Sequence, residues 1–154
     1  MKKIVLISDS HNNTLGINKL LPIMDEADYV ISLGDTINDQ DTLEALYGDK
    51  LIAVKGNCDN NDLPLEKIID IDDVKLLLTH GHNYRVKTTL LEVIKRVHEI
   101  GANAVFFGHT HIAVIEDREG VKLINPGAMW NRGTMSYCYI VIVNGSIIAR
   151  VVTI

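Results

Sequence analysis

The sequence has few cysteines and no long apolar run. Of its 154 residues only Cys58 and Cys138 are cysteines, too few and too far apart to predict a disulfide framework. No apolar stretch approaches the length of a membrane span. The short apolar run at the N-terminus ends in Asp9-Ser10-His11 without the small-residue cleavage site of a signal peptide. We therefore expect a cytoplasmic protein that does not associate with membranes.

Clusters of basic residues are also absent. The chain has 15 Lys and Arg against 20 Asp and Glu, a net charge of −5, and no basic run that could follow a phosphate backbone. Long nucleic acid is therefore not an expected partner. If the substrate is anionic, bound cations must supply the positive charge that the side chains lack.

Linkers, repeats and low-complexity segments are missing as well, so nothing predicts a domain boundary. Hydrophobic residues make up 47% of the sequence, enough for one sizeable core. We expect residues 1–154 to form a single domain.

Short apolar runs that end in polar clusters recur along the first two thirds of the chain. Such runs, rich in Val and Ile, are typical of buried strands, and they cover residues 3–8, 29–33, 51–54, 74–78 and 104–107. Helices are predicted between them over residues 14–24, 39–47 and 87–100. The alternation predicts an α/β fold, in which ligands bind beyond the carboxyl ends of the strands. All five polar clusters occupy that position.

The last third of the chain has a different pattern. Residues 121–124, 137–143 and 147–153 are predicted strands, and Asn144-Gly145 is a strong signal for a two-residue hairpin. We expect this antiparallel part to complete a second sheet that packs on the first.

The polar clusters contain five of the six histidines and a set of possible metal ligands. In an extended segment residues two apart point the same way, so the side chains of a pair such as Asp9 and His11 can reach one point. The candidate ligands are Asp9, His11, Asp35, Asn57, His80, His109 and His111. Turn residues after strands explain Asp35 or Asn57 singly, but they do not explain four histidines. Seven ligands exceed one four-coordinate site, whereas two metals that share a carboxylate use them all. The mixture suits transition metals, of which we expect Mn; Fe, Ni, Co and Zn also fit.

In their order, these clusters resemble those of a known family. The series Asp9-Ser10-His11, Gly34-Asp35, Gly56-Asn57-Cys58-Asp59, His80-Gly81-His82 and Gly108-His109-Thr110-His111 is similar to the calcineurin-like metallophosphoesterase superfamily. Asn125-Pro126-Gly127 resembles a turn of its small bacterial and archaeal phosphodiesterases. The resemblance implies two mixed β-sheets packed as a sandwich flanked by helices, the four-layer metallophosphoesterase fold. It also implies a metal on Asp9, His11 and His111, a second on Asn57, His80 and His109, and Asp35 as the bridge.

The activity implied by the resemblance is hydrolysis of a small phosphate diester by a hydroxide that bridges two divalent metals. The candidate catalytic residues are Asn57, Cys58 and His82, and Arg132 is a candidate for binding a phosphate oxygen. Cys58 stands where the wider superfamily usually has a histidine that aids departure of the leaving group. A thiol, with an ordinary pKa of about 8.5, is neutral at pH 7 and donates hydrogen bonds less well than imidazolium. Esters with poor leaving groups are therefore expected to react slowly.

Three further expectations concern residues near these motifs and the partners of the protein. The polar residues from Asp59 to Asp62 are expected to form a solvated loop. Trp130, the only tryptophan, suits either a substrate pocket or an oligomer contact. The expected partner is a small phosphate ester, and related small enzymes suggest a homo-oligomer.

Two other functions are compatible with the sequence. The chain is similar to the small subunit of the retromer coat, which has this fold but serves protein assembly, so an interaction scaffold is one alternative. The complete set of ligands favours an enzyme, whereas an exposed apolar patch far from the site would favour the scaffold. A phosphomonoesterase is the other alternative.

Overall fold

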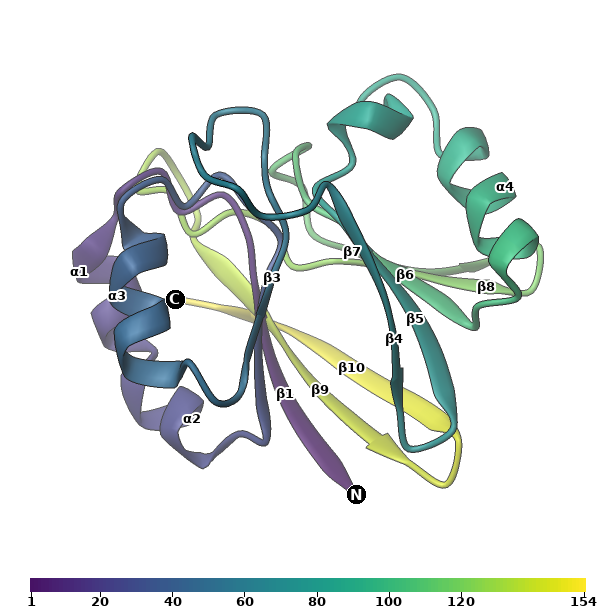
Figure 1. Cartoon of the computed structure of the whole chain (residues 1–154), viewed down its shortest axis with the longest axis horizontal. Helices are drawn as coiled ribbons and strands as arrows, with labels where there is room; N and C mark the ends of the chain where they lie inside the picture. Colours follow the sequence, from purple (N-terminus) through teal and green to yellow (C-terminus); the bar gives the residue numbers. More distant parts are fainter.

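The computed structural model describes residues 1–154 and consists of two five-stranded sheets packed face to face (Figure 1). The strand order is β10-β9-β1-β2-β3 in the first sheet and β4-β5-β6-β8-β7 in the second. The elements are β1 (Lys2–Ile7), α1 (Thr14–Lys19), α2 (Leu21–Glu26), β2 (Tyr29–Ser32), α3 (Asp39–Tyr47), β3 (Leu51–Ala53), β4 (Glu66–Ile71), β5 (Val74–Thr79), the 3₁₀ turn η1 (His82–Tyr84), α4 (Leu91–Ile100), β6 (Ala104–Phe106), β7 (Val114–Arg118), β8 (Val121–Asn125), β9 (Ser136–Val143) and β10 (Ser146–Thr153).

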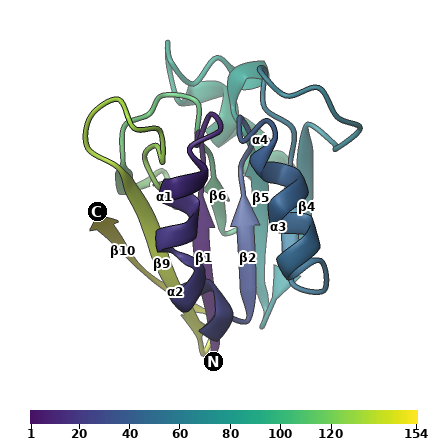
Figure 2. The ribbon, with the colours of Figure 1, turned by 90° about the vertical axis from the view of Figure 1, so that its left-hand side faces the viewer.

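The central strand β1 shows how the layers form. Its residues are apolar on both faces, and successive side chains point to opposite sides of the sheet. Ile4 and Leu6 pack between the two sheets, whereas Val5 and Ile7 pack against the helices. Helices α1, α2 and α3 lie over the outer face of β1 and β2 (Figure 2).

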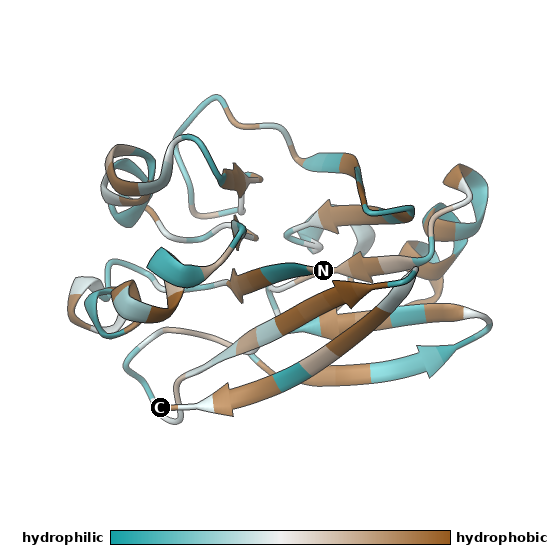
Figure 3. Cartoon of the chain, turned by 90° about the horizontal axis from the view of Figure 1, so that it is seen from below, coloured by the Kyte–Doolittle hydropathy of each residue, from teal (hydrophilic) through white to brown (hydrophobic).

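The second sheet is covered by one helix on its outer face. Helix α4 packs there through Val93, Ile94 and Val97, while Phe106 of β6 faces the first sheet. The strands are predominantly hydrophobic and the loops mainly hydrophilic (Figure 3). The order helix, sheet, sheet, helix confirms the predicted four-layer fold.

The helix boundaries differ from those predicted. Residues 14–24 form two helices instead of one, because Pro22, near the start of α2, has no backbone N–H to continue the hydrogen bonds of α1. Helix α4 begins at Leu91 instead of residue 87. At its start, the Thr89 hydroxyl accepts a hydrogen bond from the backbone N–H of Leu91. No helix in the chain is long and apolar enough to cross a membrane.

The C-terminal hairpin lies in the first sheet, not in the second as the sequence pattern predicts. Strands β9 and β10 are joined at Asn144 and Gly145 as predicted, with positive φ at both residues, but β9 pairs with β1 in the first sheet. There Ile140 and Ile142 complete the core between the sheets. The second sheet is extended instead by two edge strands, β4 and β7, whose mixed charged and apolar residues did not predict strands.

Phe106 provides a test of the core between the sheets. It is fully buried, so Phe106→Ala should lower the free energy of unfolding by about 3–5 kcal/mol through lost burial and a cavity. Ile68→Ala, at a position 43% exposed, should cost less than about 1 kcal/mol. Urea denaturation with a chelator present measures both, and equal effects would contradict this description of the core.

Candidate metal centre

The candidate ligands lie in loops that turn sharply after the strands. Five of the seven have a left-handed backbone, with φ between 45° and 69°: Asp9, His11, Asp35, His109 and His111. Positive φ is uncommon outside glycine, and Asp, Asn and His tolerate it best. Each such residue raises the free energy of the folded state by about 1–3 kcal/mol, which the surrounding structure must offset. Several of them in one place therefore indicate a functional site.

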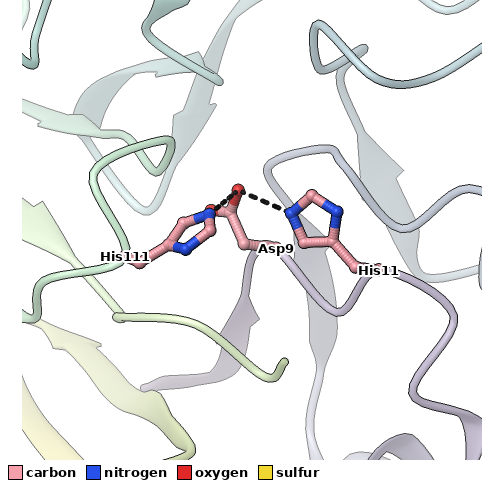
Figure 4. Close-up of side chains that lie close together, drawn as sticks. All are labelled: Asp9, His11 and His111. Carbon is pink, nitrogen blue, oxygen red and sulfur yellow. Dashed lines mark ion pairs between the residues drawn. The ribbon is translucent and has the colours of Figure 1, made fainter. Parts of the chain in front are cut away.

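The first group of ligands consists of Asp9, His11 and His111 (Figure 4). The Asp9 Oδ1 atom lies 3.2 Å from His111 Nε2 and 3.7 Å from His11 Nε2. Asp9 is fully buried, and its other oxygen, Oδ2, accepts hydrogen bonds from the Ser8 hydroxyl at 2.6 Å and from the backbone N–H of His109 at 3.0 Å. Because Oδ2 is held in this way, Oδ1 is directed at the two imidazoles.

The second group consists of Asp35, His80 and His109. His80 Nε2 lies 3.2 Å from Asp35 Oδ2 and 3.2 Å from His109 Nδ1. Two contacts of 3.8 Å connect the groups, one from His80 Nε2 to Asp9 Oδ1 and the other from His11 Nε2 to Asp35 Oδ2. The two carboxylates are thus shared among the imidazoles of both groups.

This set of donor atoms fits divalent metal ions. Asp9 Oδ1 and His11 Nε2 are buried without a hydrogen-bond partner, although buried polar atoms are almost always paired. The Nδ1 atom of His80 lies 2.8 Å from the Leu33 carbonyl oxygen. A metal-binding histidine typically donates its second N–H in this way, which fixes the tautomer and leaves Nε2 free. Metal ions would give the unpaired atoms a partner.

Charges in the cluster also favour a cation. Burial would raise the pKa of Asp9, but the interactions with His11, His111 and His80 hold it well below its usual range. Burial likewise opposes ionisation of Asp35, and His80 again lowers its pKa. Burial and the charge of His80 lower the pKa of His109 to about 4. Ionised carboxylates and a neutral His109 suit metal binding. Burial lowers the pKa of His80, but Asp35 and Asp9 raise it overall, and a metal ion at Nε2 would replace the proton that these carboxylates attract.

Asp59 supports this site, so the expectation of a solvated loop from Asp59 to Asp62 is wrong for its first residue, whereas Asn60 and Asp62 are exposed. Asp59 is 8% exposed, and its carboxylate accepts three backbone hydrogen bonds. The donors are Asp35 at 2.8 Å, Gly56 at 2.7 Å and Ile37 at 2.9 Å. One carboxylate therefore holds the Asp35 loop against the loop after β3. A signal was present, since an Asp three residues after Gly56 suits a local side-chain turn.

Asn57 and Cys58 lie beside Asp35 and are both exposed. The backbone N–H of Cys58 donates to Asp35 Oδ1 at 2.8 Å, and Asn57 Nδ2 lies 3.6 Å from Cys58 Sγ. A Cβ atom at Gly56 would collide with Asp35 Oδ1, so this close approach requires glycine. The loop thus brings the thiol next to the carboxylate between the two groups and places the Asn57 amide beside the thiol.

His82 lies behind the second group of ligands. Its ring centre is 5.5 Å from that of His80 and 6.1 Å from that of His109, and its Nδ1 atom is buried without a hydrogen-bond partner. Burial and the charge of His80 lower its pKa. His82 therefore lies near the cluster but makes no hydrogen bond to a candidate ligand.

Arg132 reaches the first group of ligands through Trp130. The Arg132 guanidinium lies over the indole ring of Trp130, 4.6 Å from its centre. The imidazole of His11 is stacked on the same indole, with the ring centres 4.2 Å apart. Trp130 also meets the ring of His111 edge-on at 5.6 Å. The tryptophan therefore covers the first group of ligands, an arrangement that its position in a turn did not predict.

Two further residues organise the loop that carries His109 and His111. Asn125 donates from Nδ2 to the Gly108 carbonyl oxygen and to the Thr110 hydroxyl, each at 3.1 Å. A Cβ atom at Gly108 would collide with the Ser8 hydroxyl, which itself binds Asp9. The Asn125-Pro126-Gly127 turn therefore anchors one ligand loop, and Gly108 allows the loops of the two sheets to meet.

The sequence profile of the calcineurin-like phosphoesterase superfamily domain matches residues 1–145. The chain belongs to this superfamily. It is 34% identical to the probable metallophosphoesterase YsnB of Bacillus subtilis, and the match covers 96% of this chain and 88% of YsnB. It is 31% identical to the phosphodiesterase MJ0936 of Methanocaldococcus jannaschii, over 81% of its own length and 82% of MJ0936. Phosphoesterases of this superfamily use divalent metals, in agreement with the donor atoms described above.

Two solved structures show the similarity in fold. A predicted phosphoesterase from Streptococcus pneumoniae has a TM-score of 0.85 at 22% identity, over 99% of this chain and 89% of the other. Vps29 from Entamoeba histolytica, in complex with Zn²⁺, has a TM-score of 0.75 at 18% identity, over 98% of each chain. At these identities the similarity establishes the fold alone.

Replacing Asp59 should weaken the metal centre without touching a ligand. Asp59→Ala leaves three backbone N–H groups without their partner, so unfolding should become easier by about 2–4 kcal/mol. Binding of Mn²⁺ should weaken by about 10–100-fold, because the Asp35 loop loses its anchor. Denaturation and calorimetric titration measure the two effects. Asp62→Ala, an exposed position in the same loop, is the control, and equal behaviour of the two variants would refute the anchoring role.

Proposed function

We propose that this chain is a metal-dependent phosphodiesterase that hydrolyses a small phosphate diester with two divalent metal ions. The observation that carries the proposal is the pair of buried carboxylates, Asp9 and Asp35, each in contact with imidazoles of both sheets at 3.2–3.8 Å. A single metal ion would compensate the negative charge of one carboxylate and bind its group of imidazoles. Two groups that share their donors suit a pair of ions, the arrangement used to cleave phosphate esters.

The residues take the following roles in this proposal. One metal ion would be held by Asp9, His11 and His111, the other by Asn57, His80 and His109, with Asp35 between them. We propose Mn²⁺ as the native ion, with Fe, Ni, Co and Zn as alternatives that suit the same donors. When bound, such ions lower the pKa of a water molecule and withdraw electrons from the phosphoryl oxygens. In the reaction, the water oxygen forms a bond to phosphorus, the bond to one ester oxygen breaks, and that oxygen takes up a proton.

The protonation states of Cys58 and His82 bear on that last proton. Desolvation and the charge of Asp35 raise the pKa of Cys58, so the thiol keeps its proton at neutral pH. Burial lowers the pKa of His82, so its imidazole is neutral. Both residues are therefore uncharged hydrogen-bonding groups. The positive charge that would stabilise a departing alkoxide is missing from both, so good leaving groups are favoured.

The charge balance around the site favours a diester over a monoester. A phosphodiester carries one negative charge at neutral pH, whereas a monoester carries between one and two. The cationic side chains near the ligands are Arg132 and Lys87, and the chain has a net charge of −5. The phosphodiesterase name of the relative MJ0936 supports the same choice.

An interaction scaffold is the second candidate function, and one feature favours it. The outer face of β9 and β10 carries an apolar groove of about 390 Å³ that contains no candidate metal ligand. Its residues include Ile23, Tyr137, Tyr139 and Val141. The fold shared with Vps29 is compatible with this function. The complete set of donor atoms around two buried carboxylates, however, suits catalysis by a pair of metal ions, and for that reason we favour the enzyme.

The metal-dependent activity can be tested with aryl esters. Chelated protein, with each metal added back, should cleave an aryl phosphodiester faster than the corresponding monoester. Asp35→Ala and His111→Ala should lower kcat/KM about a thousandfold or more, because the donors around the metals are incomplete. They should also lose most of the rise in Tm that Mn²⁺ gives the wild-type protein.

His98→Ala is the matched control for these variants. His98 lies on α4 and contacts only the Glu119 carbonyl oxygen, at 2.9 Å, so its replacement should leave turnover unchanged. Near-normal turnover in Asp35→Ala would exclude the proposed ligand set. Folded protein that is inactive with every metal would favour the scaffold.

The role of Cys58 can be tested through the leaving group. Cys58→His introduces a group that can carry positive charge, so it should accelerate hydrolysis of a diester with a poor alkyl leaving group by about tenfold or more. Its effect on a p-nitrophenyl leaving group should be small. The slope of log kcat against leaving-group pKa, measured for both proteins, is the readout. An unchanged slope would argue against any role of this position in leaving-group departure.

A further inference from the structure

An apolar groove adjoins the second group of ligands and contains none of the candidate ligands. It has a volume of about 470 Å³, which lies in the range of small-molecule sites. Two segments form it, the chain after η1 and the chain that carries His109 and His111 toward β7. Its apolar lining consists of Val86, Leu90, Phe107, Ile112 and Val114.

The groove has a buried floor and an exposed wall. Phe107 and Val86 form the floor, with 1% and 5% of their surface exposed, whereas Ile112 is 66% exposed. Val86 also packs so closely on Gly81 that a Cβ atom there would lie 2.8 Å from a Val86 methyl group. This contact joins the groove to the His80-Gly81-His82 loop. The five apolar side chains of the groove form one contiguous surface beside the polar site, and a contiguous apolar surface of this kind suits a ligand.

Thr110 connects the groove directly to the metal centre. It lines the groove and lies between His109 and His111 in the sequence. Its hydroxyl accepts hydrogen bonds from Ile112 N–H and Asn125 Nδ2, both at 3.1 Å. Since its position is fixed from both sides, the wall of the groove is held in place before a ligand arrives, which lowers the cost of binding.

Lys87 gives the groove a positively charged edge. It lines the groove together with Thr110, the residue between His109 and His111, and it is exposed. Its neighbour Arg85 is neutralised by Glu92, with Nε and Oε2 2.9 Å apart, whereas Lys87 has no carboxylate partner. An apolar surface with one free cation at the metal end complements an apolar group attached to an anionic phosphate.

We propose that this groove binds the ester group that stays on phosphorus, and that this group is aromatic or otherwise apolar. In an in-line displacement the attacking and leaving oxygens share one axis, so the remaining ester points to the side. A groove beside His109 is where such a group can lie while the phosphate contacts the metal centre and Lys87. This inference rests on the phosphodiesterase function proposed above and defines the substrate class as diesters with one apolar ester group.

Two diesters with the same leaving group test the proposal. Phenyl p-nitrophenyl phosphate and methyl p-nitrophenyl phosphate differ only in the ester that stays. After division by their rates of uncatalysed hydrolysis, kcat/KM should be about tenfold or more higher for the phenyl compound, because its ring is buried in the groove. Equal corrected values would overturn the proposal, whereas no cleavage of either compound with any metal would instead contradict the phosphodiesterase function.

Variants of single residues show which part of the protein causes the preference for the phenyl diester. Ile112→Ser, at an exposed position that tolerates the change, should reduce the phenyl preference to about threefold or less. Leu46→Ser, at a position 54% exposed on α3, is the control and should keep it. Lys87→Gln should raise KM for both diesters about two- to fivefold, since it removes an attraction to the shared phosphate. A phenyl preference that survives in Ile112→Ser would place the aromatic group elsewhere.

A binding measurement is independent of turnover. In the protein loaded with diamagnetic Zn²⁺, diphenyl phosphate should shift the methyl NMR signals of Val86, Ile112 and Val114 and leave those of Val141 on the outer face of β9 unchanged. Shifts at Val141 alone, or no shifts at saturating ligand, would overturn the assignment. Groove signals that move with protein concentration in the absence of diphenyl phosphate would show that a second copy of the chain covers the groove, which would also refute it.

Discussion

Two buried carboxylates, Asp9 and Asp35, determine much of the structure around them. A carboxylate removed from water is costly unless cations or hydrogen bonds compensate its charge. One oxygen of each carboxylate accepts hydrogen bonds, in Asp9 from Ser8 and the backbone of His109 and in Asp35 from the backbone of Cys58. Imidazoles face the other oxygen of each carboxylate. The positive φ angles of the ligands and the glycines at positions 56 and 108 follow from this requirement, because they let the loops come this close.

The compensation comes from both sheets. Asp9 and Asp35 follow β1 and β2 of the first sheet, whereas His80 and His109 follow β5 and β6 of the second. The geometry of the ligands therefore depends on how the sheets pack, and the side chains between them, Phe106 among others, set the distances at the site. Loops with functional side chains on a rigid two-sheet scaffold are a common solution, because the core provides the stability that the strained loops lack.

The sequence was informative where a local pattern reflects burial or chemistry. Strands such as β1 are apolar on both faces, and histidines repeatedly follow them, so the fold and the candidate ligands could be predicted. Where partners are distant in the chain, prediction failed. Asp59 is buried because its carboxylate accepts a hydrogen bond from the backbone N–H of Asp35, 24 residues away. Strand β9 pairs with β1 although more than 130 residues separate Lys2 from Ser136. Edge strands β4 and β7 have one exposed face, so their charged residues hide the strand pattern.

Trp130 has a consequence for how the protein can be observed. It is the only tryptophan of the chain, and its ring is stacked on that of His11 at 4.2 Å. The ultraviolet emission of the folded protein therefore comes largely from one indole in contact with a candidate ligand. An ion with unpaired d electrons bound to His11 would shorten the excited state of the indole, whereas Zn²⁺, with its filled d shell, would not. The chain thus contains an intrinsic optical indicator that distinguishes the kind of ion it holds.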